Sequence, residues 1–162
     1  MRLMESAIAM FETEIVEALY RADSDRLWRA LYAYAGDRDI ASDAVAETYA
    51  QVLNRGSAVR DPAAWVWRTA FRITAGAMKA RRSTDRVVVG PDEHVDRYAD
   101  PDLLAALRQL PDSQRAAVVL FYYVDLPIRE IATRLGTNGL AVRANLSRGR
   151  RRLRTLLGER DG

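Results

Sequence analysis

The stretch IREIATRLGTNGLAVRANL, Ile128 to Leu146, has a spacing that specifies two helices joined by a tight turn. Ala132 is a small residue where two helices can touch, and Gly136, four residues later, allows the chain to turn. Val142 follows six residues after the glycine as a β-branched anchor. This is the spacing of a helix-turn-helix motif, whose second helix enters the major groove of DNA. The alternative interpretation is a basic surface helix without a special role.

The second helix of this motif separates into an apolar face and an outward face. Val142, Leu146, Leu153 and Leu157 recur at helical spacing and are predicted to face the core. Arginines beyond the outward face extend the positive charge toward phosphates, and Arg143 is the best candidate for a base-edge contact. The residues predicted to face outward are Gly139, Leu140, Arg143, Ala144, Ser147 and Arg148.

Shorter helices are predicted upstream of the motif. The segments PDLLAALRQL, PDSQRAAVVLFYYV and PIREIATRL each have proline at or near the start, which marks helix N-termini, and the last helix begins near Asn138. Residues 83–100 contain Gly90-Pro91 and no helical period, so they are predicted to be a linker, with a possible short strand at Val87–Val89 that has no visible partner. The second domain is therefore expected at residues 101–162.

Helical periodicity also dominates residues 1–82, the expected first domain. The segment SDRLWRALYAYAG predicts a helix with Ser24 or Asp25 as its cap and Gly36 as its stop. The segment DIASDAVAETYAQVL repeats the pattern before NRGS interrupts it. Asp61-Pro62 then supplies an N-cap and a proline for the next helix. The predicted fold class is all-α, with two small helical domains joined by a linker.

Composition excludes several classes of function. Cysteine is absent and the single histidine, His94, lies in the linker without an obvious nucleophile or second ligand. We therefore expect no enzyme activity, no metal site and no cofactor. No apolar run is long enough for a membrane span, and the N-terminus has too many glutamates for a signal peptide. A cytoplasmic binding protein is the expected class.

Charge gathers in two basic islands. Residues 62–82 carry five basic side chains and no carboxylate, and residues 139–162 carry seven arginines against Glu159 and Asp161. Residues 1–61 are acidic, with 7 basic and 11 acidic side chains. Two islands separated by acidic or neutral stretches suggest two contacts with one polyanion, although two solvated helix faces would give the same pattern.

The first basic island forms a cationic stripe on its predicted helix. Arg68, Arg72, Lys79 and Arg82 share one face, with Trp65 at the head of the stripe. The opposite, core-directed face is predicted to consist of Val66, Ala70, Ile73 and Ala77, and Trp67 is predicted to be core. Charge beside an aromatic platform suits single-stranded nucleic acid, because phosphates need cations and unstacked bases need π-faces. The alternative is that both tryptophans are core and the cations are solvated.

In this order the parts resemble regions two and four of the extracytoplasmic-function (ECF) group of bacterial RNA polymerase sigma factors. The similar segments are LYRADSDRLWRALYAYAGDRDIASDAVAETYAQVL, DPAAWVWRTAFRITAGAMKARR and LRQLPDSQRAAVVLFYYVDLPIREIATRLGTNGLAVRANLSRGRRRLRTLL. The resemblance implies a protein that binds core RNA polymerase and directs it to promoter DNA. The first domain would melt the −10 element and the second would read the −35 element. An anti-sigma protein is a further expected partner.

The resemblance also implies roles for individual residues. Asp43 and Glu47 match the acidic pair on the helix that docks on polymerase, although Ala46 stands where the family usually has glutamine. The loop Asn54 to Asp61 matches the one that captures an extruded −10 base. The implied −10 residues are Asn54, Arg55, Ser57, Arg60, Trp65, Arg68, Arg72 and Lys79; the implied −35 residues are Thr137, Asn138, Gly139, Leu140, Arg143, Ala144, Ser147 and Arg148.

Two other functions remain open at this point. One is a stand-alone helix-turn-helix regulator that binds duplex DNA by itself, which does not explain the acidic pair Asp43 and Glu47. The other is a sigma-mimicking adaptor that binds an anti-sigma protein without engaging a promoter, which does not need the arginines of the last helix. The departures Leu140 and Ala141, where the family usually has glycine and threonine, leave the promoter sequence unspecified.

Overall fold

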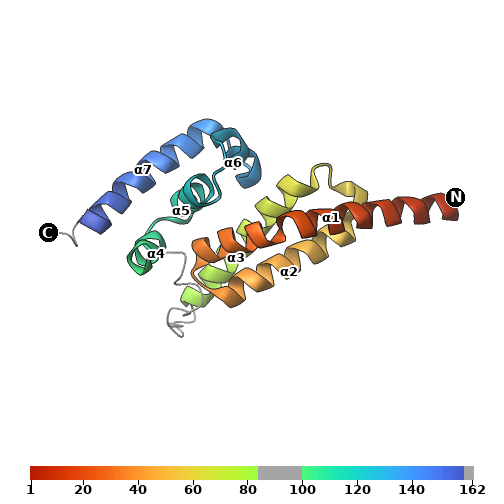
Figure 1. Ribbon diagram of the computed structural model, residues 1–162, viewed down its shortest axis with the longest axis horizontal. Coiled ribbons are helices and arrows are strands. Elements are labelled where there is room, and N and C mark those ends of the chain that lie inside the picture. The colour runs from red at the N-terminus through yellow and green to blue at the C-terminus, as the bar shows by residue number, and fades with distance from the viewer. Residues whose placement is uncertain (84–99, 159–162) are drawn as a thin grey trace.

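The computed structural model describes residues 1–83 and 100–158, which form seven α-helices and no strand (Figure 1). The predicted all-α fold class is thus confirmed. The possible strand at Val87–Val89 and His94 lie outside the described residues, as does most of the predicted linker. The helices are α1 (Arg2–Ala35), α2 (Arg38–Arg55), α3 (Pro62–Ser83), α4 (Pro101–Arg108), α5 (Asp112–Val118), α6 (Ile128–Leu135) and α7 (Gly139–Gly158), with a 3-10 turn η1 (Gly56–Ala58) and a π-helical turn η2 (Val119–Tyr123).

Helix α1 begins much earlier than the sequence predicted. The expected cap at Ser24 or Asp25 is wrong, because both residues lie inside a continuous helix that starts at Arg2. No glycine or proline interrupts the chain between Arg2 and Ala35. The preceding residues therefore continue as helix, and Ser24 and Asp25 do not mark the start of a new one. The predicted stop is confirmed: Gly36 has a φ of 68°, and its N–H donates to the carbonyl of Tyr32 at 2.7 Å.

Helices α1, α2 and α3 pack into a bundle around a shared apolar core. Leu27 and Leu31 of α1, Val52 of α2, and Val66 and Trp67 of α3 are each at most 1% exposed. The prediction that Trp67 is core is therefore confirmed. The core-directed face of α3 is deepest at its start, where Val66 and Ala70 are buried, and becomes half-buried at Ile73 and Ala77.

Local capping fixes where α2 and α3 begin. The backbone N–H of Ile40 donates to Asp37 Oδ1 at 3.0 Å at the start of α2. The predicted Asp61 cap of α3 is confirmed, because the N–H of Ala64 donates to Asp61 Oδ1 at 3.2 Å and Pro62 is the first helical residue. The Asp61 cap fixes the point at which the loop between α2 and α3 ends.

The helix-turn-helix motif forms as the spacing predicted. Gly136 adopts a left-handed φ of 69° between α6 and α7, and Ala132 and Val142 are buried where the two helices meet. The side chain of Asn138 caps α7 by accepting from the N–H of Ala141 at 2.9 Å. Leu146 is buried with Val142, whereas Leu153 and Leu157 are half-buried.

The segment predicted as one helix after Pro111 changes its winding. It forms α5 as far as Val118 and then the π-helical turn η2. Helix α7 crosses α5 closely at Gly149, where an added Cβ would lie 2.9 Å from Val118 Cγ2. Gly149 is thus the small residue that allows this close approach.

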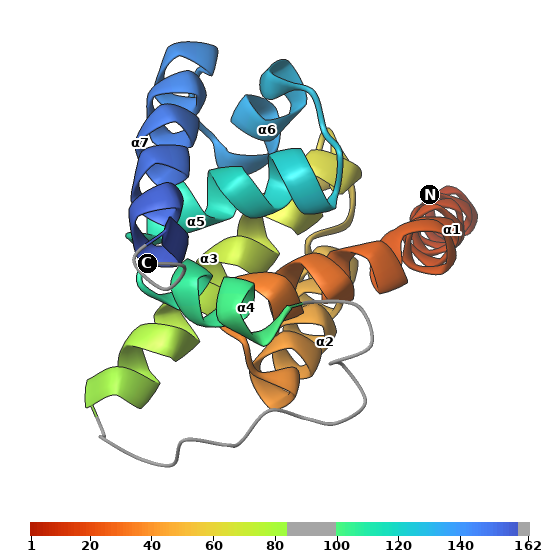
Figure 2. The ribbon, with the colours of Figure 1, turned by 60° about the vertical axis from the view of Figure 1, so that its left-hand side comes forward.

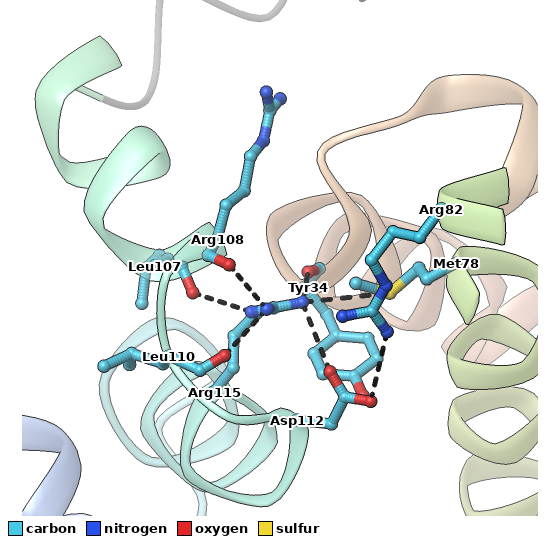
Figure 3. Close-up of polar contacts among 8 residues, drawn as sticks. All are labelled: Tyr34, Met78, Arg82, Leu107, Arg108, Leu110, Asp112 and Arg115. Atoms are coloured by element: carbon cyan, nitrogen blue, oxygen red, sulfur yellow. Dashed lines mark hydrogen bonds and ion pairs between the residues drawn. The ribbon is translucent and has the colours of Figure 1, made fainter. Parts of the chain in front are cut away.

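The two groups of helices lie against one another, as Figures 1 and 2 show for α4–α7 along one side of the α1–α3 bundle. The buried side chain of Arg115, which is 2% exposed, is central to this contact. Its Nε donates to Leu107 O at 2.7 Å, and its Nη2 donates to Arg108 O and Leu110 O, both at 2.8 Å (Figure 3). Leu107 and Arg108 are the last residues of α4 and Leu110 follows it, so the Arg115 side chain caps the C-terminus of this helix.

The remaining nitrogen of Arg115 contacts the other group of helices. Its Nη1 donates to the carbonyl of Tyr34 at 3.3 Å, near the C-terminus of α1, and lies 3.9 Å from Met78 Sδ of α3 (Figure 3). The guanidinium also lies 5.4 Å from the centre of the Tyr34 ring. One cation therefore meets the C-terminal carbonyls of two helices, where the helix dipoles are negative. Burial, reinforced by Asp112, raises the pKa of Tyr34 to about 12, so its phenol stays neutral.

Replacing Arg115 by alanine should destabilise the whole chain. The change removes the Arg115 donors from the carbonyls of Arg108 and Leu110 and one of the donors of the Leu107 carbonyl, and we expect a loss of about 3 kcal/mol or more in the free energy of unfolding. Urea denaturation followed by circular dichroism measures the loss. The matched control is Arg129→Ala, which removes an exposed arginine of α6 and should stay within about 0.5 kcal/mol of the original protein. Equal effects of the two changes would contradict a structural role for Arg115.

Candidate nucleic-acid interface

The recognition helix α7 presents a partly exposed outward face. Leu140, Arg143, Ser147 and Arg148 are exposed, as the periodicity predicted. Gly139 and Ala144, predicted to face outward with them, are only half-exposed because they border the packing of α7 on α6. In the preceding turn, Thr137 and Asn138 are both exposed, but the Asn138 amide oxygen is engaged as the helix cap. Arg143 and Arg148 are therefore the long cationic side chains on this face.

Further arginines continue along α7 toward its C-terminus. Arg151, Arg152 and Arg154 are exposed. Arg150 is half-buried, with its Nε donating to the carbonyl of Leu146 at 3.3 Å and its guanidinium 6.0 Å from the centre of the Tyr122 ring. The exposed members of this run suit phosphate contacts, whereas Arg150 is held against the protein.

The cationic stripe on α3 is also exposed at Arg68, Arg72 and Lys79. Trp65, at the head of the stripe, is half-buried against the bundle core. The guanidinium of Arg55, the last residue of α2, lies 5.6 Å from the centre of the Trp65 ring. This contact joins the end of α2 to the start of α3 across the loop.

The loop between α2 and α3 presents several polar side chains. It consists of the end of α2, the turn η1 and the residues that lead to the Asp61 cap. Asn54, Arg55, Ser57 and Arg60 are all exposed. The structure thus brings the predicted loop residues beside Trp65 at one end of the bundle.

The acidic pair lies on the exposed face of α2. Asp43 and Glu47 are one helical turn apart and both exposed, while Ala44 and Val45 between them are buried in the bundle. Gln51, one turn further on, donates its Nε2 to Glu47 Oε1 at 2.8 Å. This pair therefore forms an acidic surface held on a rigid helix.

A contact that the sequence did not predict joins the helix-turn-helix motif to α3. The guanidinium of Arg134, on α6, lies 4.5 Å from the centre of the buried Trp67 ring. Asp23 of α1 accepts from Trp67 Nε1 and also lies 3.9 Å from Arg134 Nη1. Burial lowers the pKa of Arg134, an effect that Asp23 opposes. This arginine, aromatic and carboxylate form one cluster between the two halves, with Trp67 buried and Arg134 and Asp23 half-buried.

Arg68 of the cationic stripe lies within the same contact. A Cβ added to Gly136, in the turn of the helix-turn-helix motif, would lie 3.2 Å from Arg68 Cδ. Arg26 of α1 also reaches across and donates its Nη2 to the carbonyl of Val124 at 2.7 Å. The stripe on α3 and the turn of the motif therefore face one another in this structure.

No local signal in the sequence identifies this contact. Arg134 lies one helical turn after Glu130, a spacing typical of a solvated ion pair on a helix surface. Its Nη2 lies 3.8 Å from Glu130 Oε2. Trp67 lies on another helix far away in the chain. The periodicity of α3 predicted that Trp67 is core, but nothing in the sequence indicated that Arg134 lies over its ring.

The described residues show neither a metal-binding group nor a membrane-crossing helix. Over residues 1–83 and 100–158, no cluster of three or more histidine, aspartate or glutamate side chains is placed to hold an ion. None of the described helices combines the length and the apolar character needed to cross a bilayer.

The chain resembles known proteins along most of its length. Residues 101–153 match the family described as "Sigma-70, region 4". The chain is 28% identical to RNA polymerase sigma factor SigV of Bacillus subtilis over 145 residues, which cover 83% of this chain and 86% of SigV. It is 31% identical to ECF RNA polymerase sigma factor SigL of Mycobacterium tuberculosis over an alignment that covers 95% of each protein.

A solved structure shares the fold. The chain superposes on CnrH, solved in complex with the cytosolic domain of CnrY, with a TM-score of 0.72 and 20% identity over 98% of this chain and 97% of CnrH. The match to SigL covers nearly the whole of both proteins, and the region-four match falls on α4 to α7. The chain has both the helix-turn-helix motif and the three-helix bundle, and it belongs to the ECF family of RNA polymerase sigma factors, which act in transcription initiation.

Proposed function

We propose that the two groups of helices divide the work of a sigma factor between them. Residues 1–82 would bind core RNA polymerase and the −10 element, and residues 101–162 would read the −35 element. Residues 83–100 would connect these two domains. The observation that supports this division best is the exposure of Arg143 and Arg148 on the outward face of α7, apart from the cationic stripe on α3. The protein would then contact promoter DNA at two places.

Polymerase docking is assigned to the acidic pair Asp43 and Glu47. Both carboxylates are exposed on one face of α2, whose other face is fixed in the bundle core. A rigid acidic face suits a cationic protein surface, because charge complementarity steers association and fixes register. Core RNA polymerase is the proposed partner at this face.

The −10 strand is assigned to the loop between α2 and α3 and to the stripe that follows it. Arg55, Ser57 and Arg60 are exposed there, beside the edge of the half-buried Trp65. An extruded base needs an aromatic surface and its phosphates need cations. Arg55 already lies over the Trp65 ring at 5.6 Å, so a base that stacks on this ring would take the place of the guanidinium.

Reading of the −35 element is assigned to α7. Arg143 lies in the N-terminal part of the helix, which is the part that reaches base edges in helix-turn-helix complexes. The neighbouring Leu140 and Ala144 offer no hydrogen bonds and suit thymine methyl groups. Arg148, Arg151 and Arg152 follow along the helix, where they suit phosphates.

The docked arrangement of the two halves is assigned to the protein before it engages a promoter. Arg68, which belongs to the −10 stripe, lies against the helix-turn-helix turn at Gly136. A DNA strand on the stripe would occupy the space that this turn now takes. The halves therefore have to separate before both promoter elements are bound, and core polymerase would favour the separated form by binding it more tightly.

The remaining properties follow from this assignment. The relatives are sigma factors and not enzymes, and we propose that this chain likewise contributes no catalysis of its own. It would act in the cytoplasm, where polymerase and promoter DNA are found, and an anti-sigma protein is a further proposed partner. The exposed arginines of α7 favour this function over that of an adaptor that never meets DNA.

Reversing the acidic face should abolish function by preventing polymerase binding. We expect Asp43→Arg combined with Glu47→Arg to remove co-purification with core RNA polymerase and promoter-dependent run-off transcription, because cations would then face a cationic surface. The matched control is Glu17→Arg with Asp25→Arg, the same charge change on exposed residues of α1. Circular dichroism verifies folding of both variants. Normal docking by the Asp43/Glu47 variant would refute this surface.

Two arginines of α7 should differ in what they contribute to promoter binding. Arg143→Ala should cost about 1–3 kcal/mol on the preferred −35 sequence and relax specificity at one position. Arg151→Ala, the matched control, should weaken all sequences alike and reduce the salt dependence of binding by about one phosphate contact. Holoenzyme binding to promoter fragments selected from a genomic pool, and to scrambled versions, measures both effects. An equal loss on both kinds of DNA would make Arg143 a phosphate contact.

A further inference from the structure

The first half of α1 exposes an apolar stripe that no other described part of the chain covers. Its N-terminal turns extend beyond α2 and η1 (Figure 1). Met4, Ile8, Phe11 and Ile15 are 67%, 50%, 64% and 42% exposed, and their spacing of four, three and four residues places them on one side of the helix. This alternation of three and four is the seam spacing of helices that pair with another helix. We refer to these four residues as the apolar stripe.

The apolar stripe forms one wall of an open groove. The opposite wall consists of Val52 and Leu53 at the end of α2, with Val59 and Pro62 beyond η1, and the groove has a volume of about 590 Å³. Leu53 is itself 49% exposed, so both walls present apolar surface to solvent. Exposed apolar surface of this kind marks an interaction site on a folded protein. We call this feature the N-terminal groove.

Carboxylates border the apolar stripe. Glu5 and Glu12, seven residues apart, follow one side of the stripe, and Glu14 lies on the other side. Glu12 also reaches the far wall, where a Cβ added to Gly56 would lie 2.7 Å from its Oε2. Of the described residues that line the groove, Arg60 alone is basic. The groove is therefore apolar at its centre and acidic at its edges.

This charge pattern decides which occupant fits. Residues 1–17 carry four glutamates and one arginine, so nucleic acid and anionic lipid surfaces are repelled. A second copy of the chain would bring its own four glutamates to the same place, and in an antiparallel pair the side of the stripe that carries Glu5 and Glu12 would meet the same side of the other copy. The complementary occupant is an apolar helix flanked by lysine or arginine, bound in the manner of a helix in a groove.

We propose that the N-terminal groove binds a basic amphipathic helix of a partner protein, and that this partner blocks promoter opening. The second part rests on the proposed function, because the groove shares Gly56, Ser57 and Arg60 with the loop assigned to the −10 base. A helix seated between the apolar stripe and Leu53 lies against that loop. Bound partner and captured base then exclude one another, while the acidic pair Asp43 and Glu47 stays outside the groove.

A designed peptide tests the chemistry of the groove on the full-length chain. The probe is a labelled 18-residue helix with leucine at both seam positions and lysine beside them, and its binding is followed by fluorescence anisotropy. We expect Phe11→Asp to weaken binding at least tenfold. Met10→Asp is the matched control, because Met10 is 63% exposed on the same turn but does not line the groove. A second peptide with glutamate in place of lysine should bind at least tenfold more weakly than the first.

Several results would overturn the proposal. Equal binding of the lysine and glutamate peptides would remove the charge argument, and equal effects of Phe11→Asp and Met10→Asp would place the peptide elsewhere. A sedimentation measurement that shows a dimer of the unmodified chain, dissociated by Phe11→Asp, would make a second copy the occupant. Binding of the chain to anionic vesicles, abolished by Phe11→Asp, would make the occupant a membrane surface.

Permanganate reactivity of promoter DNA with holoenzyme tests the blocking role. The lysine peptide should reduce opening by the unmodified protein at least tenfold and leave opening by the Phe11→Asp variant unchanged. Peptide binding with undiminished opening would overturn the blocking role. Failure of the proposed function would be distinguishable, since it would abolish opening without any peptide while the anisotropy experiment would still report on the groove.

Discussion

The fold depends on one buried guanidinium, that of Arg115, which serves the ends of two helices at once. Its five N–H donors meet the carbonyls of Leu107, Arg108, Leu110 and Tyr34 and the sulfur of Met78. A buried charge is tolerated here because every donor has an acceptor and because helix C-termini are negative. Three of these acceptors belong to the end of α4 and two to the α1–α3 bundle, so one side chain both organises the C-terminal half and holds it on the N-terminal half.

This division of the five donors bears on the proposed separation of the halves, because the contacts of Arg115 within the C-terminal half do not depend on docking. On separation Arg115 keeps the three carbonyls at the end of α4 and loses only Tyr34 and Met78. The second contact, between Arg134, Trp67 and Asp23, combines a cation over an aromatic ring with a weak ion pair at 3.9 Å. The buried apolar side chains of the two halves also form one continuous cluster, so the docked form is held by apolar packing as well as by these polar contacts. Under the proposed function, core polymerase would displace this docked form by binding the separated form more tightly.

Short-range features of this fold could be predicted from the sequence, and long-range ones could not. The cap at Asp61, the stops at Gly36 and Gly136 and the helix-turn-helix spacing depend on residues a few positions apart, so their signals are local. The prediction for the start of α1 was wrong because a residue that prefers the N-cap position does not begin a new helix when the residues before it are already helical. The partners of Arg115 and Arg134 could not be predicted, because a buried arginine leaves the same pattern in a sequence as a solvated one.

The same distinction between short-range and long-range features applies to the candidate nucleic-acid interface. Periodicity sorted the exposed residues of α7 and α3 well, since Arg143, Arg148 and Arg72 lie on the surface as expected. It could not show that Arg68 lies against Gly136, because that contact depends on how the two halves are docked. The most direct test of the account is the distance between the halves, measured by electron–electron resonance between spin labels at Ala50→Cys on α2 and Thr155→Cys on α7 in a chain without native cysteines. The account predicts a single distance in the free protein, that of the docked arrangement, and a different distance with core polymerase and promoter DNA, and an unchanged distance would contradict it.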